Sequence, residues 1–455
     1  MLKSQCFFIL AITLISSSLE KTKEEWKTRS IYQLLTDRYH RGNSSLEKCD
    51  PAPMKYCGGT FKGIKEHLDH IADLGFNAIW ISPVVENTPD SYHGYHMTSL
   101  TKINPYFGTA SELKELVNEA HLRNIWVMVD VVANHVGPVG NDFSQINPFN
   151  EAIYYHDDCP ITDWNNQWMV ENCRLAGLPD LKHENKFVND TLVQWIKKLV
   201  TEYDFDGIRI DTIPEVPKWF WKKFADSAGV YQLGEAFNAN AAYVANYQDV
   251  IDALFNYPLY YSISKSFCGD MNNLKEYYYN DRRAFKDVSV LGVFVENHDN
   301  ARFLFKCNDH NKFINAIVFS ILWEGIPVFY YGGEYFFNGG DDPLNRESLW
   351  DFMGKESEII PFLKASNNVR IQYKIWEYEV NLILFDKDIF IFKRNNVLIA
   401  VTNGSDVEKI ISNHGFDEGT VLYNTFDETD TLTVTDGKIN IKLEKKPKIY
   451  LKKGE

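Results

Sequence analysis

The feature that most constrains the fold of this chain is a short apolar run followed by a helical pattern, repeated eight times. Between the runs, apolar residues recur at helical spacing, as at Leu113, Leu116 and Val117. This alternation predicts an α/β fold, a (β/α)8 TIM barrel. A doubly wound open sheet is the alternative, but no glycine-rich GxGxxG turn opens the first unit. The runs are Ile31–Leu35, Ala78–Ser82, Trp126–Val132, Gly207–Ile210, Val230–Leu233, Val250–Phe255, Leu291–Val295 and Ile326–Tyr330.

Two regions depart from the alternation. More than fifty residues separate Val132 from the helix that begins near Phe187, which is too many for an ordinary barrel loop. We expect an inserted subdomain over the barrel mouth after the third strand. After about Tyr373, apolar residues alternate with period two, which predicts a C-terminal antiparallel β-sandwich. The predicted domains are residues 19–134 and 187–374 for the catalytic barrel, 135–186 for the insertion and 375–455 for the β-sandwich.

Five strands are expected in the C-terminal domain, and Asp436-Gly437 is a strong hairpin signal between the last two. The lysines near the end of the chain are expected to protect an edge strand. The expected strands are Asn381–Phe385, Ile389–Lys393, Val397–Val401, Thr431–Thr435 and Lys438–Leu443.

Residues 1–18 have the form of a secretory signal peptide. Lys3 supplies a positive charge, Cys6–Ile15 is an apolar run too short to span a bilayer, and small residues follow at Ser16–Ser18. We therefore expect the protein to be secreted, or to reach the lumen of a digestive compartment. No later stretch is long and apolar enough for a membrane helix.

Without that segment six cysteines remain, an even number that suits disulfides in an oxidising compartment. No CxxC pair occurs, which disfavours a metal site built from cysteine. Glycosylation sequons begin at Asn43, Asn189 and Asn403. The expected pairs are Cys49–Cys57 and Cys159–Cys173, from their proximity in the sequence, and Cys268–Cys307, from the count alone.

The net negative charge of the chain disfavours some classes of binding partner. Asp and Glu total 62 against 47 Lys and Arg, a formal net charge of −15. Nucleic acid and anionic membranes both require basic surfaces, so neither is an expected partner. Aromatic residues make up 15% of the chain, and their flat faces suit the apolar faces of sugar rings, although a large aromatic core would give the same figure.

Three carboxylates stand at the carboxyl ends of different predicted strands, namely Asp211, Glu235 and Asp299. In a parallel barrel these ends meet at the face that carries the active site. Glycoside hydrolysis needs one carboxylate to attack the anomeric carbon and another to protonate the leaving oxygen. Arg209 points to the same side of its strand as Asp211. The alternative to a catalytic role for these two residues is a structural ion pair.

A series of motifs along the chain resembles the α-amylase family of glycoside hydrolases, and most closely its secreted fungal-type members. The motifs are Ser30-Ile-Tyr-Gln-Leu-Leu-Thr-Asp-Arg, Tyr56-Cys-Gly-Gly-Thr, Tyr92-His-Gly-Tyr, Asp130-Val-Val-Ala-Asn-His, Leu178-Pro-Asp-Leu, Gly207-Ile-Arg-Ile-Asp, Gly234-Glu, Phe294-Val-Glu-Asn-His-Asp-Asn and Asp342-Pro-Leu-Asn-Arg. They span nearly the whole chain beyond the signal peptide.

The resemblance implies a role for each carboxylate. Asp211 would be the nucleophile that forms a covalent glycosyl-enzyme, with Arg209 orienting it. Glu235 would be the general acid and then the base, and Asp299 would stabilise the transition state through sugar hydroxyls. The implied outcome is retention of anomeric configuration. The further residues expected to bind the substrate are Tyr92, His93, Tyr95, His135, His298, Asp342 and Arg346.

The resemblance also implies a structural Ca²⁺ between the barrel and the insertion. Asn134, Glu171 and Asp180 match the side-chain ligands, and Glu215 would supply its backbone carbonyl. All of these are oxygen donors, which Ca²⁺ prefers. For each of these residues taken alone, an ordinary polar loop position is the alternative.

The chain departs from the fungal-type pattern at Pro214-Glu215, where that pattern has Lys-His. Proline there also resembles some α-glucosidases of the same superfamily. The leading hypothesis is an endo-acting α-amylase that acts as a monomer on α-1,4-glucans. The alternatives are an exo-acting α-glucosidase and a non-catalytic binding subunit.

Overall fold

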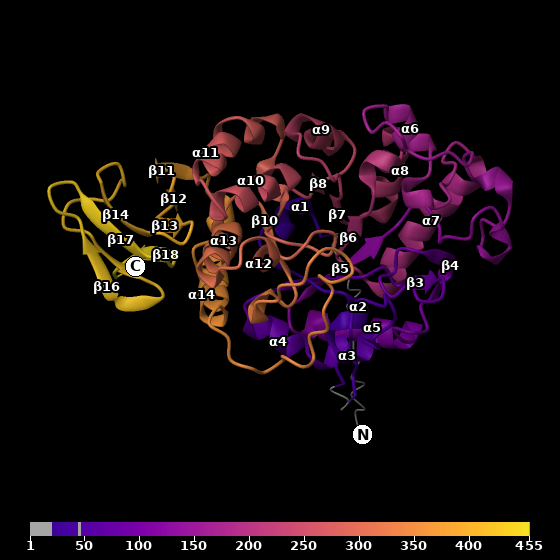
Figure 1. Cartoon of the computed structure of the whole chain (residues 1–455), viewed down its shortest axis with the longest axis horizontal. Coiled ribbons are helices and arrows are strands. Elements are labelled where there is room, and N and C mark those ends of the chain that lie inside the picture. The colour runs from indigo at the N-terminus through magenta and orange to yellow at the C-terminus, as the bar shows by residue number, and fades with distance from the viewer. Residues whose placement is uncertain (1–20, 44–46, 455) are drawn as a thin grey trace, which may run out of the picture.

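The computed structural model describes residues 21–43 and 47–454, so the predicted signal peptide lies outside the described residues. Each of the eight predicted runs contains a strand, and every pairing among these strands is parallel. A parallel bridge between Phe255 and Gly292 joins the two ends of the sheet and closes the barrel. Figure 1 shows this barrel in the middle of the molecule. The strands, in the order of the sheet, are β8 (Ala253–Leu254), β7 (Tyr231–Gly234), β6 (Gly207–Ile210), β5 (Trp126–Val131), β2 (Ala78–Ile81), β1 (Ile31–Gln33), β10 (Ile326–Tyr330) and β9 (Gly292–Phe294).

The closing position favours glycine. A Cβ atom at Gly292 would lie 3.1 Å from carbon atoms of both Leu233 and Phe255, closer than such contacts ordinarily are. The strands are buried along their whole length because helices cover their outer side and apolar side chains fill the inside. The sequence prediction of a TIM barrel is therefore confirmed.

The predicted apolar stripes at Leu113–Val117 and after Phe187 lie in helices that cover the barrel. In the longest, α7 (Lys186–Tyr203), the apolar stripe that includes Leu192, Trp195 and Leu199 is buried. The other helices are α1 (Lys23–Trp26), α2 (Thr36–Tyr39), α3 (Phe61–Glu66), α4 (Leu68–Asp73), α5 (Ala110–Leu122), α6 (Gln167–Asn172), α8 (Lys218–Ala228), α9 (Ala241–Ala245), α10 (Tyr257–Phe267), α11 (Asn272–Tyr279), α12 (Phe303–Lys306), α13 (His310–Leu322) and α14 (Ile360–Gln372).

The long connection after β5 folds back on itself as an insertion. A bridge pairs His135 with Asp180, and another pairs Tyr155 with Leu181. A second small element, the hairpin of β3 (Val85–Asn87) and β4 (Met97–Ile103), is absent from the sequence prediction. The strand β3 has only three residues and β4 carries no regular apolar alternation. The strand β4 is bonded to the insertion through the bridge of Ser99 with Asn147.

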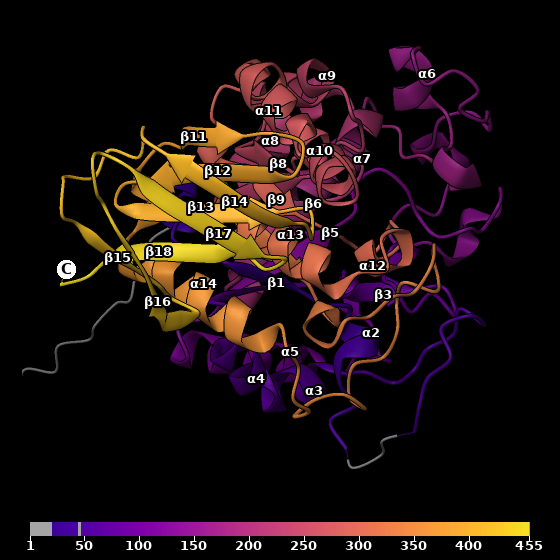
Figure 2. The same cartoon turned by 60° about the vertical axis from the view of Figure 1, so that its left-hand side comes forward.

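The C-terminal domain contains a six-stranded antiparallel sheet and a two-stranded sheet with an apolar core between them (Figure 2). The β-sandwich prediction is confirmed. The six-stranded sheet runs β11 (Asn381–Phe385), β12 (Ile389–Arg394), β13 (Val397–Thr402), β18 (Lys448–Lys452), β15 (Val421–Asn424), β16 (Asp427–Thr433), and the two-stranded sheet pairs β14 (Asp406–Ile411) with β17 (Ile439–Glu444).

Two details of that prediction are wrong. The turn at Asp436-Gly437 forms, with both residues at positive φ, but β16 pairs with β15 and β17 with β14, so the two arms enter different sheets. The last strand of the lysine-rich end is not an edge either. The strand β18 lies between β13 and β15, and its three consecutive apolar residues, which include Tyr450, are buried between its two lysines.

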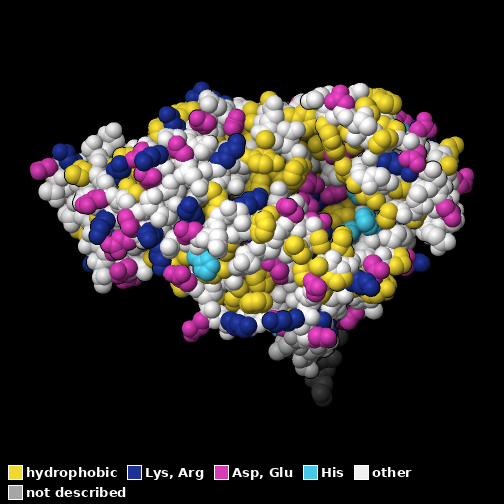
Figure 3. All heavy atoms as spheres, viewed as in Figure 1, with side chains coloured by type: hydrophobic (Ala, Val, Ile, Leu, Met, Phe, Trp, Pro, Cys, Tyr) yellow, Lys and Arg dark blue, Asp and Glu magenta, His cyan; other side chains and the backbone are white. Residues whose placement is uncertain are grey.

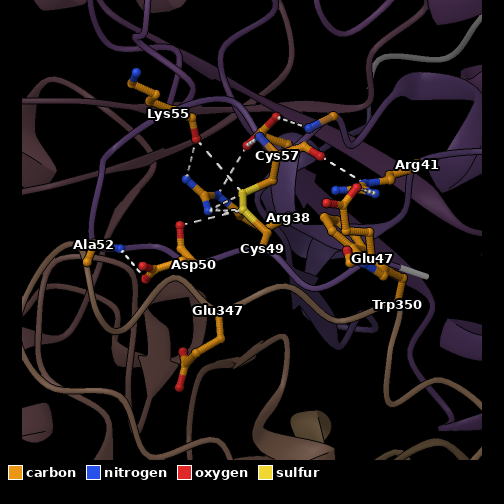
Figure 4. The surroundings of a disulfide bond; sticks show 12 residues. Arg38, Arg41, Glu47, Cys49, Asp50, Ala52, Lys55, Cys57, Glu347 and Trp350 are labelled. Atoms are coloured by element: carbon orange, nitrogen blue, oxygen red, sulfur yellow. Dashed lines mark hydrogen bonds and ion pairs between the residues drawn. A yellow bond between two sulfur atoms is a disulfide. The ribbon is translucent and has the colours of Figure 1, made fainter. Parts of the chain in front are cut away.

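All three predicted disulfides are present, with Cα–Cα distances of 5.6, 5.0 and 5.7 Å in sequence order. Figure 4 shows the first, Cys49–Cys57, against the guanidinium of Arg38. Arg38 donates to Cys49 Sγ (3.2 Å) and to the Lys55 carbonyl (2.9 Å), and it lies 3.9 Å from the ring centre of Tyr92. The disulfide loop is thus held beside a residue of the predicted site. In the described residues, no helix is long and apolar enough to cross a membrane.

Candidate active site

The predicted site residues converge at the carboxyl ends of the barrel strands. Asp211 follows β6, Glu235 follows β7 and Asp299 lies in the loop after β9. Figure 3 shows acidic and histidine side chains together in a hollow of the surface. The corresponding pocket has a volume of about 560 Å³. Of the predicted residues, those that line it are His93, Tyr95, His135, Asp211, Glu215, Glu235, Asp299, Asp342 and Arg346.

One buried guanidinium connects the carboxylates. Arg209 donates from one nitrogen to Asp211 Oδ1 at 2.7 Å, and its other terminal nitrogen lies 2.8 Å from Glu235 Oε2. It also donates to Asp130 Oδ1 at 3.1 Å. The sequence predicted only the contact with Asp211. The positions of the two carboxylates are therefore fixed relative to each other by a single rigid group.

Glu235 has the environment of a proton donor. Its Oε1 accepts from Tyr257 Oη at 3.2 Å, and Oε2 accepts from the Thr212 amide at 3.4 Å. Burial raises the pKa of Glu235 well above its usual value, and the negative charges of Asp299 and Asp211 add to the rise while Arg209 opposes it. A carboxyl group with a raised pKa keeps its proton to higher pH than an ordinary one and can give it to a leaving group.

The backbone after Asp211 is strained. Thr212 has φ 51° and ψ 53°, in the left-handed region that β-branched residues rarely adopt. This conformation points its amide at Glu235. The strain thus coincides with the contact between the two strand ends that carry the carboxylates.

Asp299 is positioned by its own loop and by Arg346. The Asn297 side chain accepts from the Asp299 amide at 3.1 Å, and Arg346 lies 3.8 Å from Asp299 Oδ1. Arg346 also donates to the His298 carbonyl at 3.0 Å and pairs with Asp342 at 3.0 Å. These contacts bring Asp342 and Arg346 to the same side of the pocket as Asp299.

A hydrogen-bonded chain behind the pocket fixes the proton positions on His298. Gln33 Nε2 lies 2.8 Å from His298 Nδ1, so Nδ1 accepts and Nε2 carries the proton. Nε2 then donates to Tyr95 Oη at 2.8 Å, and that hydroxyl donates to Asp130 Oδ2 at 2.7 Å. Burial lowers the pKa of His298 well below its usual value, which keeps the ring neutral.

Two members of this hydrogen-bonded series, Gln33 and Asp130, are not among the predicted site residues. Both are buried polar residues inside predicted strands. A carboxylate in a strand that is otherwise apolar is the signal that could have identified Asp130, since a buried charge requires a partner.

Exposed apolar side chains surround the pocket entrance. Trp164, Phe237 and Met54 all line it and remain 57%, 50% and 45% exposed. None of the three is among the predicted site residues. Large apolar side chains that stay in water at the rim of a polar pocket are typical of a ligand-binding surface.

Comparisons with known proteins show which family this chain is similar to. Residues 33–381 match the family model described as alpha amylase, catalytic domain. An α-amylase of Saccharomycopsis fibuligera is 39% identical over 88% of this chain and 86% of its own length. Alpha-amylase 1 of Schwanniomyces occidentalis is 37% identical over 96% and 91%. The structure of an α-amylase from Malbranchea cinnamomea superposes with a TM-score of 0.91, at 34% identity, over 95% and 97%.

The chain belongs to the α-amylase family. It is thus a glycoside hydrolase by family, and the retaining mechanism is general to that family. Members of the α-amylase family commonly bind calcium, so the predicted ligands can be tested for their fit to this ion.

Oxygen atoms from three segments converge beside the pocket. One terminal atom of the Asn134 amide lies 2.9 Å from Asp180 Oδ1 and 3.1 Å from the Glu215 carbonyl oxygen. His135 decides which atom this is. Its Nε2 lies 3.1 Å from the Tyr95 carbonyl, which can only accept, so Nε2 carries the proton and Nδ1 accepts.

The donor to His135 Nδ1 is then Asn134 Nδ2, at 3.2 Å. Burial lowers the pKa of His135, which keeps the ring neutral and Nδ1 an acceptor. The Asn134 oxygen must therefore face the other two oxygens. Three oxygens at this spacing without a donor between them fit a hard cation such as Ca²⁺.

The fourth predicted ligand, Glu171, lies close to the same turn. Its Oε1 accepts from Gln167 Nε2 at 2.9 Å, and the same nitrogen donates to the Pro214 carbonyl at 2.9 Å. Across residues 21–43 and 47–454, no group of three or more His, Cys, Asp or Glu side chains is placed to hold a metal ion. A site here would depend on an amide and a backbone carbonyl as well as on carboxylates.

Proposed function

We propose that this protein is a retaining α-amylase that hydrolyses internal α-1,4-glucosidic bonds of starch, glycogen and maltooligosaccharides. The observation that carries the proposal is the Arg209 guanidinium, which holds Asp211 and Glu235 in one pocket with Asp299. Retaining glycosidases use two carboxyl groups about 5–5.5 Å apart. The α-amylase names of the relatives over most of the chain support the same activity.

In the first step, Asp211 attacks the anomeric carbon while the bond from that carbon to the glycosidic oxygen breaks. Glu235 gives its proton to this oxygen, so the leaving chain departs as a neutral hydroxyl. Asp299 accepts hydrogen bonds from sugar hydroxyls and favours the positive charge of the transition state. Water then attacks the glycosyl-enzyme, Glu235 takes its proton, and Asp211 is released.

The neutral His298 contributes a donor rather than a charge. Its Nε2 proton faces the pocket side where Tyr95 and Asp299 meet, at 2.8 and 3.4 Å. We infer that a sugar hydroxyl replaces one of these partners. Tyr95 and His298 stack with ring centres 5.4 Å apart, so Tyr95 can present a flat surface to the same sugar.

We infer that Asn134, Asp180 and the Glu215 carbonyl would hold Ca²⁺, with Glu171 contributing from α6. The ion would be structural, since it would tie the insertion to the strand ends that carry Asp211. Asn134 links this cluster to His135 and hence to the pocket.

The rival exo-acting α-glucosidase is favoured by Pro214, which offers no side-chain donor on the leaving-group side. The Glu215 side chain lines the pocket instead. A maltooligosaccharide blocked at its non-reducing end separates the two activities. We expect cleavage within the blocked chain, and its absence would favour the exo-acting reading.

The decisive variant for catalysis itself is Asp211→Asn. Loss of the nucleophile should reduce the release of reducing sugar from soluble starch by about 10⁴-fold or more. Equal, slow release by this variant and the wild type would instead indicate a non-catalytic binding subunit.

We also infer secretion, supported by the apolar N-terminal run and by three disulfides. The domain boundaries and the monomeric state stay predictions. Among the sequons, Asn189 is 9% exposed within α7, so the folded protein offers little access to it.

A further inference from the structure

A second groove lies next to the catalytic pocket, where α6 and α8 meet (upper right in Figure 1). Its volume is about 630 Å³. Two tryptophans line it, Trp168 from α6 and Trp219 from α8, and they remain 64% and 45% exposed. No role in the proposed reaction falls to either side chain.

These tryptophans are not required by the core of their helices. The buried face of α6 is formed by Val170, and that of α8 includes Phe220, Trp221 and Phe224. A tryptophan side chain can bury roughly 150–250 Å² of surface, and about half or more of each of these two side chains stays in water. Two such side chains in one recess indicate a surface that a ligand covers.

The rest of the groove is polar. Lys218 Nζ donates to the Asn246 carbonyl at 2.9 Å and lies 4.8 Å from the ring centre of Tyr247. The Glu184 carboxylate pairs with His156 at 3.0 Å. Aromatic rings beside amide, ammonium and carboxylate groups match a sugar, which has an apolar C–H face and a hydroxyl edge. A purely apolar ligand would exclude solvent from these polar groups and would satisfy none of their remaining hydrogen-bonding capacity.

The groove shares a wall with the catalytic pocket. Thr212 and Glu215 line the pocket, and Pro217 and Lys218 line the groove. The segment before and within α6 likewise places Trp164 at the pocket and Trp168 in the groove. Gln167 joins the two walls by donating to the Pro214 carbonyl at 2.9 Å.

We propose that the Trp168–Trp219 groove is a non-catalytic binding site for an α-glucan chain, one that holds polymeric substrate beside the catalytic pocket. The identity of this ligand rests on the proposed function. A glucan long enough to extend beyond the pocket gains contacts in the groove, whereas a short oligosaccharide does not.

The test compares Trp168→Ala/Trp219→Ala with the wild type in two assays. Binding to insoluble starch granules is measured in an Asp211→Asn background, so that the polymer is not digested. Hydrolysis of a short blocked maltooligosaccharide is measured with Asp211 intact. We expect granule affinity to fall at least fivefold, and kcat/KM for the short substrate to stay within twofold of the wild type.

Two further variants separate stacking from folding. Trp168→Phe/Trp219→Phe keeps the aromatic faces and should keep most of the granule affinity. Tyr279→Ala removes an aromatic side chain that is 40% exposed on α11, outside the groove, and should change nothing.

Unchanged granule affinity of the alanine variant would overturn the proposal, as would an equal loss in the Tyr279→Ala control. If the alanine variant keeps its granule affinity but loses a dimer that the wild type forms, the groove binds a second copy of the chain. That result would also overturn the proposal. If the wild type fails to cleave the short substrate, the proposed function fails, while the granule assay still reports on the groove.

Discussion

At the scale of single residues, Arg209 determines how the proposed catalytic carboxylates lie. Its side chain is 2% exposed, and each of its three carboxylate partners is at most 11% exposed. A buried ion pair is costly when one partner is removed, because the other charge then lacks compensation. Lysine keeps the charge but cannot bridge two carboxylates with parallel donors.

Arg209→Lys should therefore lower kcat by about 10²–10³-fold, the loss typical of removing one preorganised donor in an active site. The measurement is kcat on a short blocked maltooligosaccharide, with a melting curve to check that the variant folds. Arg282→Lys is a matched control, since Arg282 pairs through two nitrogens with Glu324 away from the pocket. A kcat for Arg209→Lys within twofold of the wild type would contradict the bridging role.

The raised pKa of Glu235 predicts the alkaline side of the pH profile. Glu235 must be protonated to act, so kcat should fall as pH rises through its pKa. Asp299→Asn removes a negative charge that raises this pKa, and the alkaline limb should move to lower pH even though kcat itself drops.

The midpoint pH of the alkaline limb is measured from the residual activity of Asp299→Asn over a series of pH values. Asp226→Asn, at an exposed carboxylate on α8, should leave it in place. A limb that stays in place in Asp299→Asn, or moves to higher pH, would contradict the assignment of Glu235 as the acid.

At the scale of elements, the sequence predicts what depends on local pattern. Strands such as β6 are buried on both faces and are followed directly by a predicted site residue, so both the strand and Asp211 could be found. The hairpin of β3 and β4 could not, because its bonds to Asn147 come from a segment far along the chain. The oxygen cluster at Asn134 was found only through the family resemblance, since its geometry depends on three separate segments.

Calcium binding should stabilise the insertion. Excess chelator is expected to lower the melting temperature of the wild type, because a ligand that binds only the folded state stabilises it. Asn134→Ala should have a lower melting temperature that chelator no longer changes. Asn150→Ala, at an exposed position in the same insertion, serves as the control. A wild-type melting temperature that chelator leaves unchanged would count against the site.

The disulfide Cys159–Cys173 closes a loop at a sequence separation of 14 and ends two residues after Glu171. Replacing both cysteines by serine should destabilise the insertion by about 3 kcal/mol, from loop-closure entropy. It should also weaken the response to added Ca²⁺. Calorimetry with and without the ion measures both effects, and an unchanged unfolding profile would contradict the link between disulfide and ion.

At the scale of the whole molecule, the insertion and the C-terminal sheets lie at opposite ends of the long axis, with the barrel between them (Figure 1). Asn315 on α13 joins the barrel to the sheets, donating to the Lys445 carbonyl at 2.8 Å and accepting from the Thr402 amide at 2.9 Å. The sequence predicted both domains but not this contact, since a polar residue on a helix gives no sign of a partner 130 residues away.

Asn315→Ala would leave the buried Thr402 amide and the part-buried Lys445 carbonyl without this partner, which should cost about 1–3 kcal/mol of stability. Because Asn315 lies at the junction, we expect wild-type barrel and sheets to unfold in one calorimetric transition and the variant to unfold earlier. Ser320→Ala on the same helix, whose hydroxyl bonds only within α13, is the control. Two separate transitions in the wild type would contradict the coupling.

The central claim is that Asp211 and Glu235 carry out retaining hydrolysis within an α-glucan chain. The most direct test follows the first products from a maltooligosaccharide blocked at its non-reducing end, by proton NMR before mutarotation. Wild-type protein should release new reducing ends as the α-anomer, and Asp211→Asn should release almost none. First-formed β-anomer, or no cleavage of the blocked chain by the wild type, would contradict this account.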